Sequence, residues 1–330
     1  MKVFESPITV NFEITRNCNA SCKFCYIKEN NQTFSPIHRI KNLIDIFKEA
    51  GILRINLFGG EPFLYPQIDE IIDYIYEKEF YLSAVTNGLS ITPALVDKIK
   101  NKINVVGVSL HGLKNEHEKI LQTNINNSFE KVIDSMRLLS SAGIHVGINM
   151  TITSENYNKI SEVVGFLKND ALVDIKFFVL NRYIPGGEDD KSLAPNPEQL
   201  LFTLKELERI SAIYKDIIFR YAISFPHCSV ASKELKGFIG RCGFGQSYCA
   251  VDELGNFKTC SYTPNILGNV FETPLKNIWK EHSILRDYRD EKWVPLKCQK
   301  CNSYENCMVG CKASSGIHPF HPDIMIGGNL

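Results

Sequence analysis

The sequence lacks an apolar run that approaches the ~20 residues needed to span a bilayer. It also lacks a net charge, because 37 Lys and Arg residues are balanced by 37 Asp and Glu residues. No basic surface for nucleic acid is therefore predicted. The N-terminal segment alternates like a strand and has no signal-peptide character. These absences predict a cytoplasmic protein that binds neither nucleic acid nor a membrane.

Cysteine is absent from residues 26 to 227, although the chain contains eleven. Three lie between residues 18 and 25, and eight lie between residues 228 and 311. A reducing cytosol disfavours structural disulfides, so clustered cysteines there indicate metal binding or catalysis. The uneven distribution predicts two domains, which we place at residues 1–225 and 226–330.

The first two thirds of the chain alternate between strand-like and helix-like segments. Apolar, β-branched runs predict strands at residues 8–14, 53–58, 81–86, 105–110, 145–152, 175–180 and 217–223. Helices are predicted at residues 37–50, 67–78, 93–100, 128–142, 156–168 and 198–214. This pattern predicts the α/β class, with βαβ units forming a partial (β/α)6 TIM-like barrel. In parallel barrels the active site lies at the carboxyl ends of the strands.

Three cysteines directly follow the first predicted strand. Cys18, Cys22 and Cys25, which we call the first triad, have the spacing C-x3-C-x2-C. Zinc sites prefer four ligands, whereas three thiolates on a [4Fe–4S] cluster leave one iron open to chelate S-adenosylmethionine (SAM). The spacing, with the aromatic Tyr26 beside the last cysteine, resembles the signature of the radical SAM superfamily. The resemblance implies that this cluster cleaves SAM to a 5′-deoxyadenosyl radical.

Residues at later strand ends extend the resemblance. The segment Gly59-Gly60-Glu61-Pro62 follows the second strand, where the family has a GGEP motif that holds the methionine amino group of SAM. Its glycines allow close backbone approach, and the Glu61 carboxylate complements an ammonium. The resemblance also implies that Asn87, Ser109 and Asn149 contact SAM, with a hydrogen-bonded structural amide as the alternative for Asn149. His111 is interpreted as a structural histidine.

The C-terminal cysteines resemble a SPASM domain, a small cysteine-rich extension of some radical SAM enzymes that carries two auxiliary [4Fe–4S] clusters. Seven cysteines match its spacing: Cys242, Cys249, Cys260, Cys298, Cys301, Cys307 and Cys311. The resemblance assigns Cys242, Cys260 and Cys311, the second triad, to one cluster. Either Cys249 or Cys228 would be its fourth ligand.

The same resemblance assigns Cys298, Cys301 and Cys307, the third triad, to the other auxiliary cluster. The last ligand of that cluster normally follows the position of Cys311, where this chain has no further cysteine. The alternatives are an open iron or a ligand from the tail, namely His318, His321, Asp323 or Met325. A structural zinc ribbon is the rival interpretation of the whole segment.

Enzymes with this extension mostly modify peptides. The resemblance therefore implies oxidative modification of a precursor-peptide side chain, forming a thioether or carbon–carbon cross-link. A tetrapyrrole or quinone-cofactor biosynthesis enzyme is the alternative, and a non-catalytic zinc-ribbon protein is the third interpretation. Ser261 stands where sulfatase-maturing members carry an Asp, which argues against that activity. One expected partner is a low-potential electron donor such as flavodoxin or ferredoxin. Because the sequence opens on its first predicted strand, a separate leader-peptide-binding protein is expected as a second partner. No catalytic acid or base is assigned.

Overall fold

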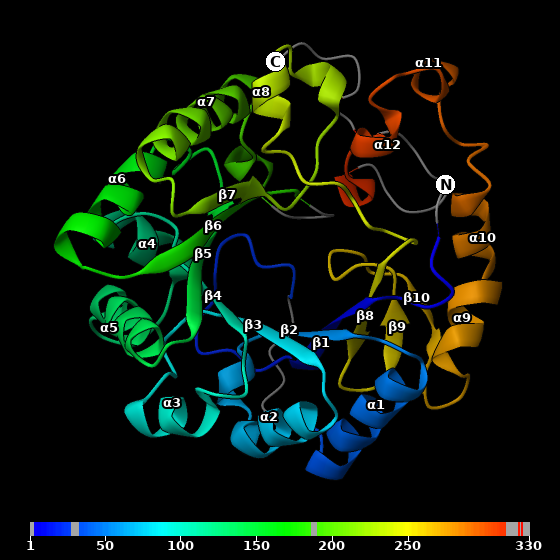
Figure 1. Ribbon diagram of the computed structural model, residues 1–330, viewed down its shortest axis with the longest axis horizontal. Helices are drawn as coiled ribbons and strands as arrows, with labels where there is room; N and C mark the ends of the chain where they lie inside the picture. The colour runs from blue at the N-terminus through cyan, green and yellow to red at the C-terminus, as the bar shows by residue number, and fades with distance from the viewer. Residues whose placement is uncertain (1–2, 28–32, 186–189, 315–322, 324, 326–330) are drawn as a thin grey trace.

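The computed structural model describes residues 3–27, 33–185, 190–314, 323 and 325. In these residues ten strands form one sheet, in the order β10-β9-β8-β1-β2-β3-β4-β5-β6-β7. The strands are Thr9–Thr15 (β1), Arg54–Gly59 (β2), Tyr81–Thr86 (β3), Val105–Ser109 (β4), His145–Ile152 (β5), Ile175–Arg182 (β6), Ile218–Tyr221 (β7), Tyr248–Asp252 (β8), Asn256–Lys258 (β9) and Ile266–Asn269 (β10). Strands β1 to β7 pair in parallel with their sequence neighbours and curve into an unclosed barrel (Figure 1).

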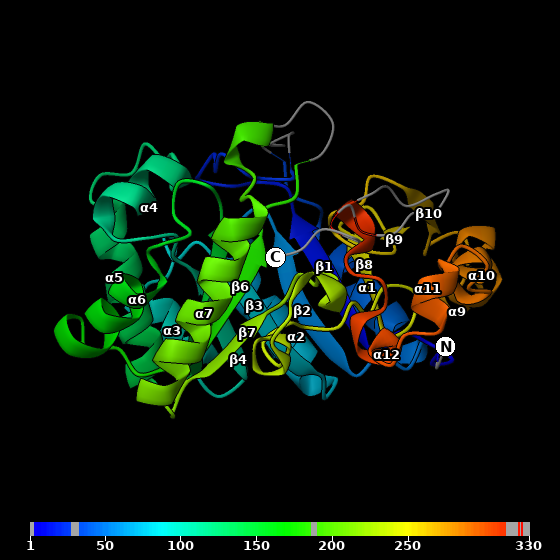
Figure 2. The ribbon, with the colours of Figure 1, turned by 90° about the horizontal axis from the view of Figure 1, so that it is seen from above.

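Helices surround the outer face of this curved sheet, and the C-terminal helices lie beside β8 to β10 (Figures 1 and 2). The α-helices are Ile37–Glu49 (α1), Ile68–Glu77 (α2), Pro93–Ile99 (α3), Lys114–Leu121 (α4), Ser128–Ser141 (α5), Ile160–Gly165 (α6), Pro197–Ile213 (α7), Lys233–Lys236 (α8), Leu275–Glu281 (α9), Ser283–Arg289 (α10), Leu296–Gln299 (α11) and Tyr304–Cys307 (α12). Short 3₁₀ turns occur at Pro62–Leu64 (η1), Lys191–Leu193 (η3), His227–Ser229 (η4) and Lys312–Ser314 (η5), and a π-helical turn at Phe166–Asp170 (η2).

Side-chain alternation in the strands explains both the core and the barrel interior. Val10, Phe12 and Ile14 of β1 are fully buried, and the Phe12 ring meets Phe47 of α1 edge-on at 5.2 Å. The intervening residue Asn11 points to the opposite face and lines the barrel cavity. Strand β1 thus buries its apolar side chains under the helices and turns Asn11 to the interior.

The sequence predicted all seven barrel strands to within two residues at each end. Helix α4 was not predicted. The helix expected from residue 156 begins at Ile160, because the Asn156 carboxamide accepts a 2.8 Å hydrogen bond from the Thr153 N–H and donates to His111 O at 2.9 Å. These side-chain bonds hold residues 153–156 in a turn that precedes the helix.

The two predicted domains share one sheet. Strand β8 pairs in parallel with β1, with Thr9 opposite Tyr248 and Glu13 opposite Asp252. Strands β8 and β9 form an antiparallel hairpin, and Gly255 adopts a φ of +84° in its turn. The boundary at residue 225 stays a prediction. None of the helices in the described part of the chain combines the length and apolarity that membrane crossing requires.

Candidate iron–sulfur and cofactor site

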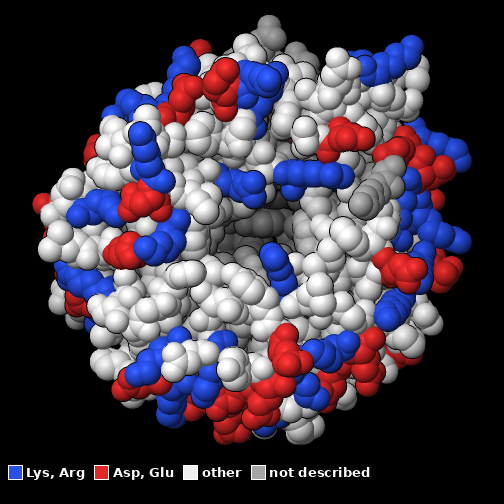
Figure 3. All heavy atoms as spheres, viewed as in Figure 1, with Lys and Arg blue, Asp and Glu red and all other residues white. Residues whose placement is uncertain are grey.

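A cavity of about 670 Å³ occupies the barrel interior. Figure 3 shows it as a hollow at the centre of this face, with basic side chains at its edge. The first triad and the second triad both line it, together with polar residues of β1 to β6. The structure therefore brings two of the three predicted cysteine groups to the walls of one cavity.

The loop that carries the first triad is held by the helix that the sequence did not predict. The N–H of Ser21 donates to Gln122 O at 2.8 Å, and the N–H of Lys23 donates to Ile120 O at 3.1 Å. Both carbonyls belong to the carboxyl end of α4 or the residue after it. Helix α4 thus fixes the loop with Cys18, Cys22 and Cys25 at the mouth of the barrel.

The glycines after β2 allow one strand-end loop to approach another. The N–H of Gly60 donates to Thr15 O at 2.8 Å, and the N–H of Glu61 donates to Asn17 O at 2.7 Å. A Cβ atom on Gly59 or Gly60 would lie 2.2 Å from Thr15 O or Asn17 O, respectively. The close approach is therefore to the segment that leads into Cys18, although both glycines also line the cavity.

Glu61 is fully buried and is absent from the described lining of the cavity. Its carboxylate accepts hydrogen bonds from the Thr86 hydroxyl and the Asn87 N–H, each at 2.7 Å, and from the Phe63 N–H at 3.1 Å. Burial raises the pKa of Glu61 to about 7 despite these bonds. Glu61 thus joins the loops after β2 and β3, and its contact with the SAM amino group stays a prediction. Pro62 is also buried and begins η1.

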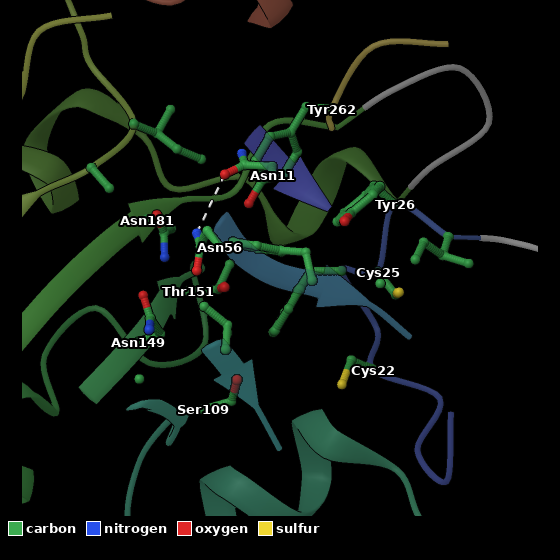
Figure 4. A pocket seen from close by; sticks show the side chains of 18 of the residues that line it. Asn11, Cys22, Cys25, Tyr26, Asn56, Ser109, Asn149, Thr151, Asn181 and Tyr262 are labelled. Carbon is green, nitrogen blue, oxygen red and sulfur yellow. Dashed lines mark hydrogen bonds between the residues drawn. The ribbon is translucent and has the colours of Figure 1, made fainter. Parts of the chain in front are cut away.

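Three other residues predicted to bind the cofactor line the cavity: Asn87, Ser109 and Asn149. The Asn87 carboxamide donates to Asn19 Oδ1 at 2.7 Å and approaches Cys18 Sγ at 3.7 Å. Ser109 and Asn149 are partners across β4 and β5, and both side chains point into the cavity (Figure 4). Their position is compatible with either ligand binding or a structural role.

A set of polar residues was missed by the sequence analysis. Further carboxamides and hydroxyls line the cavity from the interior faces of the strands: Asn11, Asn56, Ser83, Thr151 and Asn181. Asn56 donates to Asn11 at 3.3 Å, and Ser83 donates to Asn56 at 3.0 Å. Figure 4 shows these amides on one side of the cavity and Cys22 and Cys25 on the other. Isolated polar residues at inward positions of apolar strands were the available signal.

Aromatic residues also surround the first triad. Phe24, which the sequence analysis did not single out, lines the cavity and meets His111 edge-on at 4.8 Å. Burial lowers the pKa of His111 well below its usual value, and its Nδ1 accepts from the Thr151 N–H at 3.3 Å. His111 is thus hydrogen-bonded and also lines the cavity, and its interpretation as a structural histidine stays a prediction. Tyr26 lines the cavity beside Tyr262, with ring centroids 5.0 Å apart.

The chemistry of the first triad suits a cationic centre. Burial, with the charges of Glu61 and Cys25, raises the pKa of Cys18 to about 11. Burial and the charges of Cys25 and Cys18 also raise the pKa of Cys22. Three thiolates at this place therefore require compensating positive charge, which bound iron would supply.

The second triad has the same character. Burial and the Cys242 charge raise the pKa of Cys260 to about 11 and that of Cys311 to about 12. A hydrogen bond from the Tyr248 hydroxyl opposes part of the shift at Cys260. Residues of this triad come from the loop before β8, the loop after β9 and the segment before η5. The fold thus brings together thiols that are distant in the sequence.

Cys249 does not join the second triad. Strand β8 alternates, so Cys249 faces away from Tyr248, which lines the cavity. The Cys249 side chain is fully buried in the hydrophobic core, and its partner across the sheet is Val10. Burial alone raises the pKa of its thiol. We therefore correct the prediction that Cys249 is a ligand, because its strand register places it on the opposite face of the sheet.

The third triad lies in the segment that forms α11 and α12. Of the proposed tail ligands, His318 and His321 lie outside the described residues. Asp323 is buried and pairs with Arg182, and it accepts from the Cys311 N–H at 2.9 Å. Met325 Sδ also contacts Arg182. Both described tail residues thus lie near Cys311 of the second triad.

Cysteine spacing in the structure does not match a single-ion site. Within the described residues, no three His, Cys, Asp or Glu side chains converge closely enough to hold one metal ion. A zinc ribbon gathers four ligands on one atom, whereas each thiolate of a four-iron cube binds a different iron.

Comparison with known proteins agrees with this geometry. Residues 12–167 match the radical SAM superfamily, and residues 242–302 match the SPASM iron–sulfur cluster-binding domain. The AdoMet-dependent heme synthase of Methanosarcina barkeri is 25% identical, covering 93% of this chain and 92% of that protein. The mycofactocin maturase MftC of Mycobacterium tuberculosis is 24% identical, and the alignment covers 94% of this chain and 79% of MftC.

A solved structure shows the same fold. SuiB of Streptococcus suis, bound to its precursor peptide SuiA, aligns with a TM-score of 0.78 at 17% identity. The alignment covers 98% of this chain and 77% of SuiB. The fold of this chain is therefore shared with an experimentally determined protein.

Proposed function

Because the chain belongs to the radical SAM superfamily and carries a SPASM iron–sulfur domain, we propose that it oxidatively modifies a side chain of a precursor peptide. The first triad would hold the [4Fe–4S] cluster, and Gly59, Gly60, Asn87, Ser109 and Asn149 would contact SAM. When bound, these two groups supply a 5′-deoxyadenosyl radical. The protein residues bind and orient the substrate in the cavity.

The observation that carries this proposal is the polar lining between the two cysteine triads. Carboxamides such as Asn11, Asn56 and Asn181 both donate and accept hydrogen bonds, as a peptide backbone does. They lie on the cavity wall across from Cys22 and Cys25. The cavity volume of about 670 Å³ is within the range of small-ligand sites and admits a short peptide segment. The solved complex of SuiB with SuiA supports a peptide substrate by similarity.

A second candidate substrate is a tetrapyrrole carrying carboxylates. Among the described residues that line the cavity, the side chains with a permanent charge are Arg16, Arg182 and Arg241. Guanidinium groups bind carboxylates in bidentate geometry. The similarity to a heme synthase points the same way. Arg182 already pairs with Asp323, which reduces the positive charge available to a ligand.

The expected surroundings follow from the cysteine chemistry. None of the eleven cysteines forms a disulfide, which suits a reducing compartment, so we place the protein in the cytoplasm. A low-potential donor such as flavodoxin or ferredoxin would reduce it, and a separate protein would bind the leader peptide.

Mass spectrometry of a candidate precursor peptide tests the proposal. A peptide encoded beside this gene is incubated anaerobically with enzyme, SAM and a low-potential reductant. Loss of two hydrogens per modification is expected, with fragmentation locating a thioether or carbon–carbon bond. The variant with Cys18, Cys22 and Cys25 replaced by Ala is the control, which should give neither product nor 5′-deoxyadenosine.

Two outcomes would overturn parts of the proposal. An unchanged peptide, accompanied by conversion of an added tetrapyrrole carboxylate, would replace the peptide by the second substrate. Continued 5′-deoxyadenosine formation by the triple variant would remove the assignment of the first triad.

A further inference from the structure

The third triad needs a fourth ligand that its own segment does not contain. Cys298, Cys301 and Cys307 provide three thiols, and no cysteine follows Cys311. The described tail residues Asp323 and Met325 lie against Arg182 and do not reach toward the third triad with free groups. Within the described residues, a fourth ligand of this cluster would therefore come from elsewhere in the fold.

The turn η4 (His227–Ser229) lies directly against the third triad. The backbone N–H of His227 donates a hydrogen bond to Cys307 Sγ at 3.4 Å. This bond places the next residue, Cys228, beside the same thiol, and the side chain of Cys228 is exposed and not packed into the core. An N–H group that donates to a cysteine sulfur is a feature of iron–sulfur ligation, since such bonds tune the cluster potential.

Proximity divides the thiols in the same way. Cys307 and Cys228 both lie within electrostatic reach of the Cys298 thiol. The thiols within such reach of Cys311 are instead Cys242 and Cys260. Cys228 thus lies with the third triad, whereas the sequence spacing had offered it to the second.

We propose that Cys228 is the fourth protein ligand of the auxiliary [4Fe–4S] cluster held by Cys298, Cys301 and Cys307. The ligand comes from the turn between β7 and α8, so the cluster ties the end of the barrel to the α11–α12 segment. The assignment concerns cluster ligation alone and does not depend on which substrate the enzyme modifies.

A consequence concerns the other auxiliary cluster. With Cys228 assigned to the third triad and Cys249 buried in the core, three cysteines remain for the second triad. These three thiols line the cavity. One iron of that cluster would therefore lack a cysteine ligand.

Iron content and spectroscopy of the holoenzyme test the assignment without an activity assay. Cys228→Ala is made in a background in which the first triad is replaced by Ala, so that only auxiliary clusters contribute. The variant should lose about one to four irons per chain, as one four-iron cluster converts to a three-iron form or is lost. Its reduced EPR spectrum should lack one of the two auxiliary signals. Cys249→Ala in the same background is the matched control and should keep both signals.

A combination of variants separates the two auxiliary clusters. Adding Cys228→Ala to a variant without the third triad should remove no further iron. Adding it to a variant without the second triad should lower the remaining auxiliary iron by about one to four atoms per chain. The proposal is overturned if Cys228→Ala keeps the full iron content and both signals. It is also overturned if the substitution removes more iron from the variant that lacks the third triad, because Cys228 would then serve the second triad. Circular dichroism of each variant confirms that the chain is folded.

Discussion

The Asn87 backbone N–H lies 2.7 Å from a carboxylate oxygen of Glu61, and this bond joins the loop after β3 to the loop after β2. The Thr86 hydroxyl donates to the other oxygen of the same carboxylate at 2.7 Å. The Asn87 side chain in turn approaches Cys18 of the first triad. One buried carboxylate thus connects three strand ends around the predicted cluster site.

Replacement of Glu61 by Gln should destabilise this connection. The Gln side chain has one acceptor oxygen, and its NH₂ group would face a backbone N–H or a hydroxyl that also donates. One buried donor would then lose its acceptor, which costs about 1–3 kcal/mol in the free energy of unfolding. Urea unfolding measures the change. Glu70→Gln on α2 is the matched control, because Glu70 is exposed and its nitrogen–oxygen distance to Lys41 is 3.8 Å; its change should stay within about 0.5 kcal/mol. Equal effects of the two substitutions would contradict the structural role of Glu61.

Sequence reasoning located the elements that repeat a local pattern. The strands of the barrel and the first triad follow from apolar runs and from cysteine spacing. Helix α4 was missed because its buried residues are His117, Ile120 and Leu121, too few for a clear apolar face. The pairing of β8 with β1 has no local signal, since it joins segments from opposite ends of the chain.

The same limit explains the cysteine assignments. Spacing along the chain placed Cys249 and Cys228 beside the second triad, but strand register turns Cys249 into the core. The hydrogen bond from His227 to Cys307 brings the neighbouring Cys228 to the third triad. Which thiols meet is decided by long-range packing, which periodicity and spacing do not contain.

The buried histidines should make stability depend on pH. Burial lowers the pKa of His117 to about 4, and its Nδ1 accepts from the His111 N–H at 3.2 Å. His117 therefore becomes protonated near pH 6.5 in the unfolded chain but only near pH 4 in the folded chain. The stabilisation from neutral His117 is present above pH 6.5 and is lost as the pH falls through this window, by at most about 1.4 kcal/mol per pH unit.

Comparison with His117→Gln isolates this contribution. The free energy of unfolding of both proteins is measured in urea at pH 7.5, 6.5 and 5.5, with iron content checked at each pH. The difference between wild type and variant should shrink toward low pH. A difference that is constant or grows toward pH 5.5 would show that His117 does not carry the dependence.

Gly60→Ala should disturb the first triad through backbone crowding. The new Cβ would lie 2.2 Å from Asn17 O, so the loops after β1 and β2 must separate and lose the 2.7 Å bond from the Glu61 N–H. We expect a loss of about 1–3 kcal/mol in stability and weaker SAM binding, measured by unfolding and by calorimetry on the reconstituted enzyme. Gly165→Ala in α6 is the control, since its Cβ would meet no atom closer than 4.0 Å. It should be neutral or stabilising by up to about 1 kcal/mol. Wild-type SAM affinity in the Gly60 variant would contradict the proposed crowding.

The ion pair between Lys258 of β9 and Glu13 of β1 should hold the cysteine-rich extension against the barrel. The two groups are 2.6 Å apart and both are buried. Lys258→Met leaves a buried carboxylate without its partner, which costs about 3–5 kcal/mol, whereas replacing both residues by apolar ones should restore most of the stability. Lys98→Met removes an exposed pair with Asp69 and should cost less than about 1 kcal/mol.

Because the Glu13 charge also raises the pKa of Cys260, the Lys258 variant should bind less iron at the second triad than the double variant does. Unfolding and iron analysis of the four proteins check both effects, and a Lys258 variant as stable and as iron-rich as the Lys98 control would show that the pair carries neither role.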